Sequence, residues 1–411
     1  MAAVSEDQTL RQRALRVVPG GMYGHQNVGS LPAGYPQFMR RGEGSHIWDV
    51  NGREYIDLMC SYGPVVLGHH HPKVDAAAAS QQLLGDSQNG PSPVFVEAAE
   101  TFVERVRDAD WAIFSKNGTD ATTMCLTIAR AATGREKVLA ARGSYHGAAP
   151  WCTPRLSGVT TSDRANLIYF DYNDVESVRR AVDAAGGDLA AIVVTPIRHD
   201  TGTDLEWPTR EFTQALRQHC DQQGAALILD DVRCGFRLHN GGSWEEIGVP
   251  VDLSAWSKAI ANGYSLAATT GTDALREAAQ SIYTTGSFWF SAVSMAAACA
   301  TLSAFTCESS VDAMTRVGGD FVAGLEGQMH DHRIEARVSG PVQMPFLRFA
   351  NDDDFELANA FSVECLNRGL YLHPRHNWFV SAAMSERDVD GALEATNAGL
   401  ASVSKILEGR Q

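Results

Sequence analysis

The stretch 225-AALILDDVRCGF-236 joins a short apolar run directly to two acidic residues, and 252-DLSAWSKAIANGYSLAAT-269 joins a similar run to a lysine. Both runs have the length and composition of strands that are buried on both faces. Asp230 ends the first strand, and Lys258 follows the second. Because the carboxyl ends of neighbouring parallel strands meet at one edge of a sheet, we expect these two side chains to face one ligand.

Around this pair, apolar runs alternate with longer segments of helical period between about residues 95 and 305. The segment 121-ATTMCLTIARAATG-134 has that period, and Gly134 is placed to end its helix. Alternating strands and helices predict an α/β domain with a doubly wound, mostly parallel sheet. The runs expected to be strands are 111-WAIF-114, 138-VLAA-141, 167-LIYF-170, 190-AAIVV-194, 226-ALIL-229 and 253-LSAW-256.

The two ends of the chain have a different pattern, which predicts a smaller α+β domain. In 45-SHIWDVNGREYIDL-58, the pair Asn51-Gly52 predicts a hairpin between two strands. After about residue 310 we expect a strand near 344–350 and a helix over 353–369. We therefore expect residues 1–62 and 309–411 to form the small domain together, with residues 63–308 forming the large domain between them.

A lysine and an acid in this position suit an enzyme that forms a Schiff base with an aldehyde cofactor. Such an enzyme needs an amine that can lose its proton, and a buried carboxylate that holds a pyridine nitrogen protonated. Lys258 and Asp230 are the candidates for these two roles. Each residue alone has a plainer explanation, because an acid at a strand end often caps the next helix and a lone lysine is usually solvated.

Other strand ends carry groups that fit the same ligand. Gly118 and Thr119 open a helix after the first run, where amide hydrogens and the helix dipole can hold a phosphate; a plain N-cap is the alternative. Tyr145 and His146 follow the second run and can lay an aromatic face on a flat ring, although loop aromatics more often pack. The conjunction of phosphate donor, aromatic plate, acid and amine indicates one cofactor site. The fourth run is followed by Arg198 and His199.

Composition narrows the class of protein. The net charge of -15, without a basic cluster, argues against nucleic acid and anionic membrane as partners. Eight cysteines without Cys-x-x-Cys spacing, and a start without an apolar signal segment, are typical of a cytosolic protein with reduced thiols. The longest apolar stretch, 288-FWFSAVSMAAACATLSAF-305, is rich in Ala and Ser and predicts a packed helix rather than a membrane span.

Several other motifs are absent or weak. The chain has no G-x-G-x-x-G, Walker or G-x-S-x-G motif, which argues against a dinucleotide-binding protein, an NTPase or a hydrolase. The triplet His69-His70-His71 is compatible with a metal ligand set, but it precedes a proline and no carboxylate cluster accompanies it. We expect a structural loop there and no metal.

Taken together, the motifs resemble those of the class III (ω-amino acid) aminotransferases, which are fold type I pyridoxal-phosphate enzymes. The nearest branch is that of glutamate-1-semialdehyde aminomutase. The resemblance runs from about Gly20 to Ala383, nearly the whole chain. Its landmarks are 46-HIWDVNGREYIDL-58, 63-GPVVLGHHHP-72, 117-NGTDA-121, 144-SYHG-147, 228-ILDDVRCGFR-237 and 257-SKAIANG-263.

The resemblance implies a large domain with a seven-stranded, mostly parallel sheet, and pyridoxal 5'-phosphate as cofactor. It implies a homodimer whose active sites lie at the subunit interface, where the neighbouring subunit completes the phosphate site. The donor there is implied to be Ser287, with Thr285 as the alternative. The cofactor residues that it implies are Lys258 as Schiff-base lysine, Asp230 at the pyridinium nitrogen, Gly118 and Thr119 at the phosphate, Tyr145 with His146 beside one ring face, and Val232 beneath the other.

The chain also departs from its relatives. The aminomutase branch has an arginine in the early glycine loop, and 20-GGMYGHQN-27 has none, which argues against the aminomutase reaction. Arg233 stands where relatives often carry Gln or Met; it suits the cofactor's phenolic oxygen, a substrate carboxylate or a surface ion pair. Tyr62 and Trp289 are further substrate candidates, with packing as the alternative.

The expected reaction is transamination by a ping-pong mechanism. An amino acid or amine gives its amino group to the cofactor held by Lys258, and a keto acid or aldehyde then receives it. The first alternative is an aminomutase or epimerase that uses the same cofactor. The second is a non-catalytic protein that binds pyridoxal phosphate as a partner subunit. The residues do not identify the donor, the acceptor or the stereochemistry.

Overall fold

The computed structural model describes residues 5–410. It divides into two compact units, which we describe separately. The terminal unit comprises Met1–His71, Thr201–Thr203 and Asp312–Gln411, and the central unit comprises Pro72–Asp200 and Asp204–Val311. The unit limits thus lie at residues 71/72 and 311/312, whereas the sequence predicts domain limits at 62/63 and 308/309.

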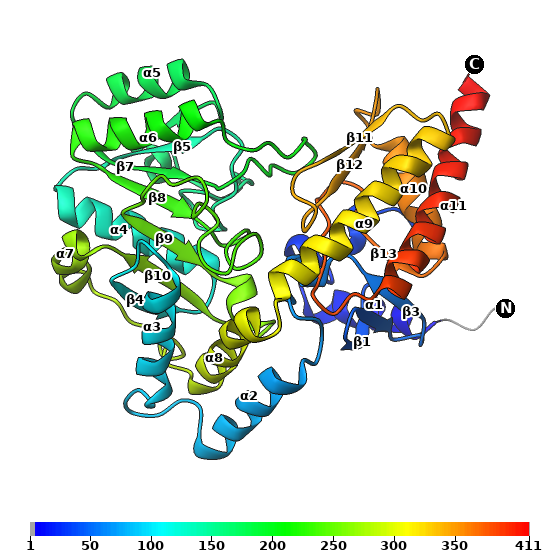
Figure 1. The fold of residues 1–411 in the computed structure, drawn as a ribbon, viewed down its shortest axis with the longest axis horizontal. Coiled ribbons are helices and arrows are strands. Elements are labelled where there is room, and N and C mark those ends of the chain that lie inside the picture. The colour runs from blue at the N-terminus through cyan, green and yellow to red at the C-terminus, as the bar shows by residue number, and fades with distance from the viewer. Residues whose placement is uncertain (1–4, 411) are drawn as a thin grey trace. The chain divides into compact units, whose positions relative to one another are not determined.

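A seven-stranded sheet organises the central unit, in the order β4-β10-β9-β8-β7-β5-β6 (Figure 1). Neighbouring strands are parallel, except that β10 runs antiparallel to both β4 and β9. Six strands match the predicted runs to within one residue at each end, which confirms the doubly wound α/β class. The strands are β4 (Trp111–Ser115), β5 (Lys137–Ala141), β6 (Leu167–Phe170), β7 (Leu189–Val194), β8 (Ala226–Asp230), β9 (Leu253–Trp256) and β10 (Ala267–Gly271).

Strand β10 is not among the runs that the sequence indicates. Its sequence, AATTG, has no large apolar side chain, so it lacks the pattern of a buried strand. All five residues are nevertheless buried, because the strand pairs with a neighbour along both edges. Pairing within the sheet therefore makes this segment a strand.

Both faces of the sheet are covered, as continuous apolar strands require. On β8, Ala226 and Ile228 belong to the core cluster that contains α4, while Leu227 and Leu229 belong to the cluster that contains α5 and α6. In Figure 1, α5 and α6 lie side by side; α6 contacts β7 and β8, and α5 contacts β5 and β6. The helices of this unit are α2 (Pro72–Leu84), α3 (Val94–Arg105), α4 (Gly118–Thr133), α5 (Val175–Ala185), α6 (Arg210–Gln223), α7 (Arg276–Ser281) and α8 (Ala292–Cys307).

Two predictions about helices of this unit are confirmed. Helix α4 ends at Gly134, whose φ of +65° is the left-handed conformation that glycine adopts readily. The Ala/Ser-rich segment forms α8, a packed helix with fully buried Ala297 and Ala298, although it begins at Ala292 rather than near residue 288. Within residues 5–410, no helix has both the length and the apolar character needed to cross a bilayer.

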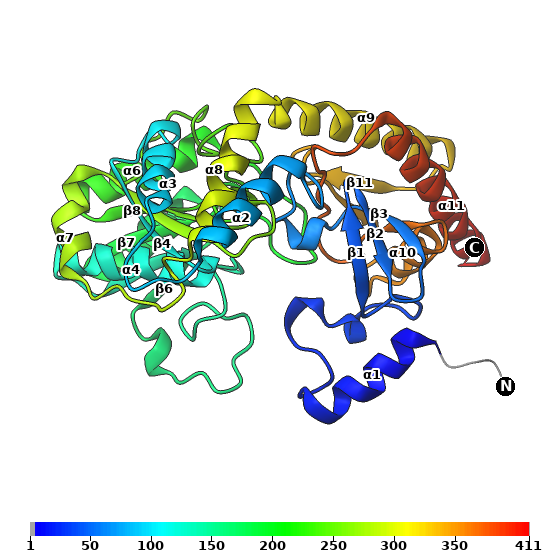
Figure 2. The same ribbon diagram turned by 90° about the horizontal axis from the view of Figure 1, so that it is seen from below.

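The terminal unit contains a four-stranded sheet in the order β1-β2-β3-β13 and a separate pair, β11-β12. Figure 2 shows β1, β2 and β3 side by side. The predicted hairpin is confirmed: β2 and β3 pair antiparallel, and Gly52 has a φ of +87°. The strands are β1 (Met39–Glu43), β2 (His46–Asp49), β3 (Glu54–Asp57), β11 (Ala336–Ser339), β12 (Phe346–Phe349) and β13 (Leu370–Tyr371).

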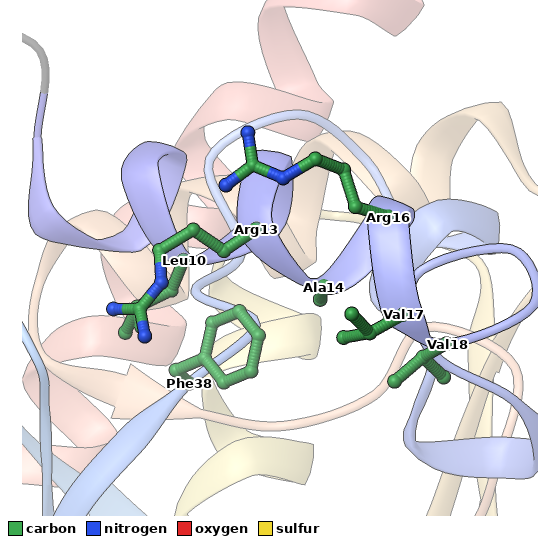
Figure 3. A pocket seen from close by; sticks show the side chains of 7 residues that line it. All are labelled: Leu10, Arg13, Ala14, Arg16, Val17, Val18 and Phe38. Atoms are coloured by element: carbon green, nitrogen blue, oxygen red, sulfur yellow. The ribbon is translucent and has the colours of Figure 1, made fainter.

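Helices cover this sheet and extend to the ends of the described chain. Helices α10 and α11 pack on each other and on β13, which confirms the helix expected over 353–369. A pocket of about 360 Å³ lies between α1 and Phe38, with Arg13 and Arg16 among apolar side chains (Figure 3). It contains none of the predicted site residues. The helices are α1 (Glu6–Val17), α9 (Ser310–Asp331), α10 (Glu356–Asn367) and α11 (Glu386–Arg410).

Candidate active site

Asp230 and Lys258 lie at the carboxyl ends of neighbouring parallel strands. Asp230 is the last residue of β8 and pairs in register with Ala255 of β9. Strand β9 ends at Trp256, and Lys258 opens the 3-10 turn η5 (Lys258–Ala261) that follows. The topology therefore brings the predicted acid and the predicted amine to the same edge of the sheet.

Lys258 is held in an unusual backbone conformation. Its φ is +51°, in the left-handed region, which costs a non-glycine residue about 1–3 kcal/mol. Surrounding structure maintains it: the Ser257 hydroxyl donates to the Leu266 carbonyl at 2.9 Å, and Ala259 and Ile260 are buried. Backbone strain of this kind is concentrated at functional sites.

The environment of the Lys258 side chain favours the neutral amine. Burial, and next the positive charge of Arg233, lower the pKa of Lys258 from 10.5 to about 7, although Asp230 acts in the opposite direction. An amine with this pKa is partly unprotonated at neutral pH. It can therefore act as a nucleophile and as a base.

Asp230 forms a buried pair with His146. A hydrogen bond of 2.7 Å joins Asp230 Oδ2 to His146 Nδ1, and the side chains are only 5% and 2% exposed. The Val232 amide donates to the other carboxylate oxygen at 3.3 Å. The indole of Trp151 stacks on the imidazole, with ring centres 6.0 Å apart. His146 thus holds the carboxylate, while its own Nε2 is buried without a hydrogen-bond partner among the described residues.

The first turn of α4 lies beside this pair. Asn117 is the N-cap and forms a capping box with Asp120, so Gly118 and Thr119 occupy the first two helical positions rather than the cap. The Ala148 amide donates to Thr119 Oγ1 at 3.1 Å, and the Thr122 hydroxyl donates to the His146 carbonyl at 2.7 Å. These bonds tie the loop that carries Tyr145 and His146 to the start of α4.

Glycine is required at two positions where these segments meet. A Cβ on Gly118 would lie 2.8 Å from a methyl group of Val232, and one on Gly147 would lie 2.5 Å from Thr119 Oγ1. Gly147 also has a φ of +127°. Val232 therefore packs directly on the first residue of α4. Tyr145 stays 40% exposed, and burial of its phenol raises its pKa.

Arg233 is buried, with 8% of its surface exposed, so it does not form the surface ion pair considered above. Its Nη1 donates to the carbonyl of His199 at 3.4 Å. Burial, and next the Arg233 charge, hold the pKa of His199 well below its usual range, so that imidazole is neutral. The ends of β7, β8 and β9 thus contribute His199, Arg233 and Lys258 in that order across the sheet.

The remaining predicted residues are not brought to this group within the central unit. Tyr62 belongs to the terminal unit, where its hydroxyl donates to the His25 carbonyl at 2.7 Å. Ser287 and Thr285 are exposed on the segment between α7 and α8. Trp289 packs against Gly286 and the core cluster around α4. A role for these residues in substrate or phosphate binding remains a prediction.

In the His triplet, His69 contacts an aspartate. His69 Nε2 lies 2.8 Å from Asp57 Oδ2, an ion-pair geometry within the terminal unit. Among residues 5–410, no three His, Cys, Asp or Glu side chains are grouped as metal ligands.

Pyridoxal phosphate fits the group of side chains in the central unit. The cofactor needs an unprotonated amine for its aldehyde, a carboxylate for its ring nitrogen and amide donors for its phosphate. Lys258, Asp230 and the first turn of α4 offer these groups. The buried imidazole nitrogens of His146 and His199 have no partners in the described chain, which points to hydrogen bonds with a polar ligand.

Two contributors were not assigned from the sequence. One is Trp151, whose indole ring lies nearly parallel to the imidazole of His146. The other is His199, which follows the fourth run and for which the sequence predicts no role. The signal available for it was its place immediately after a buried strand, which it shares with Asp230 and Lys258.

The lowered pKa of Lys258 predicts a pH dependence for the stability of the cofactor-free protein. Between pH 7 and pH 10.5 the unfolded chain keeps a proton on this amine that the folded chain has lost. Stability should therefore rise with pH in this window, by up to ~1.4 kcal/mol per unit, and the penalty should be complete below pH 7. Urea unfolding of wild type and Lys258→Met across pH 6–10 measures the difference. A pH-independent difference would contradict the shift.

Comparison with known families places the chain among transaminating enzymes. The family model described as aminotransferase class-III matches residues 30–385. The chain is 47% identical over 403 residues to the aminopentol aminotransferase of Sphingopyxis macrogoltabida, covering 98% of this chain and 96% of that one. It is 31% identical to the glutamate-1-semialdehyde 2,1-aminomutase of Roseiflexus castenholzii, covering 96% and 97%.

Comparison with solved structures supports the same family. The FumI protein of Sphingopyxis sp. MTA144, determined in its PLP internal aldimine form, superposes with a TM-score of 0.96 at 46% identity, covering 98% of this chain and 97% of that chain. The match extends over the terminal and central segments alike. The resemblance read from the motifs is confirmed.

Proposed function

The chain belongs to the class III aminotransferases, and on that premise we propose that Lys258 and Asp230 are the catalytic residues of a pyridoxal-phosphate-dependent transaminase. The observation that carries the proposal is their place at the ends of adjacent parallel strands, with the pKa of the amine lowered to about 7 and the carboxylate held by a buried histidine. The enzyme moves an amino group from an amino acid or amine to a keto acid or aldehyde.

When bound, pyridoxal phosphate supplies an aldehyde that condenses with amines and a ring that accepts electrons. Lys258 Nζ would hold the cofactor when no amine is bound, and the released amine would carry a proton to and from the substrate carbon. Asp230 would keep the ring nitrogen protonated, and His146 with the Val232 amide fixes the direction of its carboxylate. Gly118 and Thr119 would receive the phosphate, and Tyr145 and Val232 would lie against the two ring faces.

We propose a primary amine of the aminopentol kind as amino donor. The support is the 47% identity to an aminopentol aminotransferase along nearly the whole of both chains. The glycine loop at residues 20–27 adds support, because it lacks an arginine that would bind a substrate carboxylate. Tyr62 and Trp289 remain candidate substrate contacts.

A half-reaction screen tests this function. The holoenzyme is mixed in turn with an aminopentol, a simple primary amine, an α-amino acid and a β-amino acid, and loss of the cofactor's visible absorbance is followed. Addition of a keto acid should restore the absorbance. Bleaching by no amine would favour a non-catalytic cofactor-binding protein. Turnover of one substrate without any acceptor would favour a mutase or epimerase, which the 31% identity to an aminomutase makes the relevant rival.

We also propose that the enzyme acts in the cytoplasm as a homodimer, in which Ser287, or Thr285 in its place, reaches the partner's phosphate site. Large apolar side chains are exposed along the chain on either side of these hydroxyls, with Tyr283 91% and Phe288 68% exposed, and Leu83 at the end of α2 is 90% exposed. The end of α2 is joined to the start of α8, since Asp86 Oδ1 accepts from Ser291 Oγ at 2.6 Å. An apolar surface of this kind is typical of a subunit interface.

Sedimentation velocity tests the dimer. Wild type should sediment as two chains, and the double substitution Leu83→Glu with Phe288→Glu should shift it toward one chain and weaken cofactor binding. Leu156→Glu, at a side chain that is 61% exposed elsewhere on the central unit, is the control. A wild-type protein that sediments as a single chain at micromolar concentration would contradict the proposal.

A further inference from the structure

His199 is held firmly in the central unit. Next to it, Arg198 and Glu206 exchange backbone hydrogen bonds of 2.8 and 3.0 Å, which fixes the segment as an isolated bridge. The flanking side chains are paired with each other, because Arg198 Nε lies 2.9 Å from Asp200 Oδ2. His199 itself is 5% exposed. The imidazole of His199 is therefore buried, while the charged residues on either side of it, Arg198 and Asp200, pair with each other.

The His199 imidazole has a nitrogen that forms no hydrogen bond within the described chain. Nδ1 of His199 is buried without a hydrogen-bond partner in the described chain, while the His199 carbonyl accepts from Arg233 at 3.4 Å. Buried polar atoms are rarely left unmatched, so such an atom points to a ligand. Arg233, Lys258 and His146 lie close enough to act on the ring electrostatically, which places it among the groups of the candidate site.

The order of the strands shows which part of the cofactor His199 would meet. The phosphate end belongs at the first turn of α4, which follows β4 at one edge of the sheet. Lys258 follows β9, Asp230 and Arg233 follow β8, and His199 follows β7, progressively farther from β4. On the pyridoxal ring, the aldehyde carbon stands between the phosphate arm and the ring hydroxyl. The side of Lys258 away from α4 is therefore the side of the hydroxyl.

We propose that His199 is a cofactor-binding residue that donates a hydrogen bond to the ring hydroxyl oxygen of pyridoxal phosphate, with Arg233 as the adjoining positive charge. The inference rests on the proposed function, because it needs the cofactor at Lys258. A neutral imidazole carries one N–H donor, and Arg233 raises the positive potential beside it. Together they stabilise the oxygen in its anionic form.

The visible spectrum of the bound cofactor provides the test. The spectrum changes with pH, and the pH at the midpoint of that change depends on how well the negative charge on the ring oxygen is stabilised. His199→Leu removes the donor and should raise the midpoint by about 1 pH unit, and weaken binding of pyridoxal phosphate to the apoenzyme by roughly tenfold. His199→Asn keeps an N–H and should stay within about 0.3 unit of wild type. His219→Leu, on α6, is the matched control and should change neither quantity.

Outcomes separate this inference from the proposed function. If His199→Leu does not fold, His199→Phe replaces it, because phenylalanine keeps a flat ring without a donor. The same rise in the midpoint and the same loss of affinity are expected. Wild-type midpoint and affinity in either variant, once folded by circular dichroism, would overturn the role of His199 alone. Borohydride reduction followed by peptide mapping checks the premise: cofactor fixed to a lysine other than Lys258 would overturn both proposals.

Discussion

Lys258→Ala is expected to lower the rate at which an amine bleaches the cofactor absorbance by more than about 10⁴-fold. The substitution removes both the covalent attachment of the cofactor and the base that moves the substrate proton, and a base alone contributes roughly 10²–10⁴-fold. Among residues 5–410, no other lysine follows the strand that carries Asp230 or either of its neighbours in the sheet, so none is placed to replace Lys258. Single-turnover absorbance measurements give the rate.

Two variants accompany this experiment. Lys258→Arg keeps the positive charge but cannot lose its proton near neutral pH, so it should be as inactive as the alanine variant. Lys137→Ala is the matched control, because Lys137 begins β5 at the opposite end of the strands and donates to the Ala185 carbonyl at 3.0 Å. Turnover that survives in Lys258→Ala, with normal cofactor content, would refute the assignment.

Asp230→Asn is expected to reduce kcat/KM by about 10³-fold while leaving the fold intact. The amide has the shape of the carboxylate and can still meet His146, but it carries no charge to hold the ring nitrogen protonated. Loss of one preorganised electrostatic contact of this kind typically costs 10²–10³-fold, and here the charge is buried. Steady-state kinetics, together with the visible spectrum of the bound cofactor, measure the effect.

The neighbouring acid supplies the control for this substitution. Asp231 is also buried, but both its carboxylate oxygens are engaged by Ser243, at 2.6 Å from the hydroxyl and 2.8 Å from the amide. Burial raises the pKa of Asp231 to about 7, so a neutral side chain is tolerated there. Asp231→Asn should therefore keep kcat/KM within a few-fold of wild type. Equal losses in both variants would mean that Asp230 acts only through the packing of this turn.

The strands of the central sheet could be read from the sequence because they are buried on both faces. Continuous apolar runs such as 226-ALIL-229 leave few alternatives once helical segments of ordinary length separate them. β10 could not be read in this way, since its alanines and threonines become a strand only by pairing with β4 and β9. The helix start at Ala292 was likewise set by contacts, with Asp86 accepting from the amide of Val293.

Part of the candidate site could be predicted from the sequence for the same reason. Residues that follow buried parallel strands are collected at one edge of the sheet, so Asp230, Lys258, Tyr145 and His146 could be grouped without knowing any distance. The hydrogen bond between His146 and Asp230 could not be foreseen, because the two residues are 84 positions apart and their meeting depends on the order β8-β7-β5. The same holds for the burial of Arg233 against His199.

The sequence by itself determined the α/β class, the family and the two residues expected to carry the chemistry, because these depend on local periodicity and on which residue ends each strand. Only the tertiary structure decided the electrostatics: which carboxylate is held by a histidine, which arginine lies beside the amine, and which imidazole is left with an unmatched nitrogen. Those properties arise from burial and from contacts between distant segments, and a pKa depends on both.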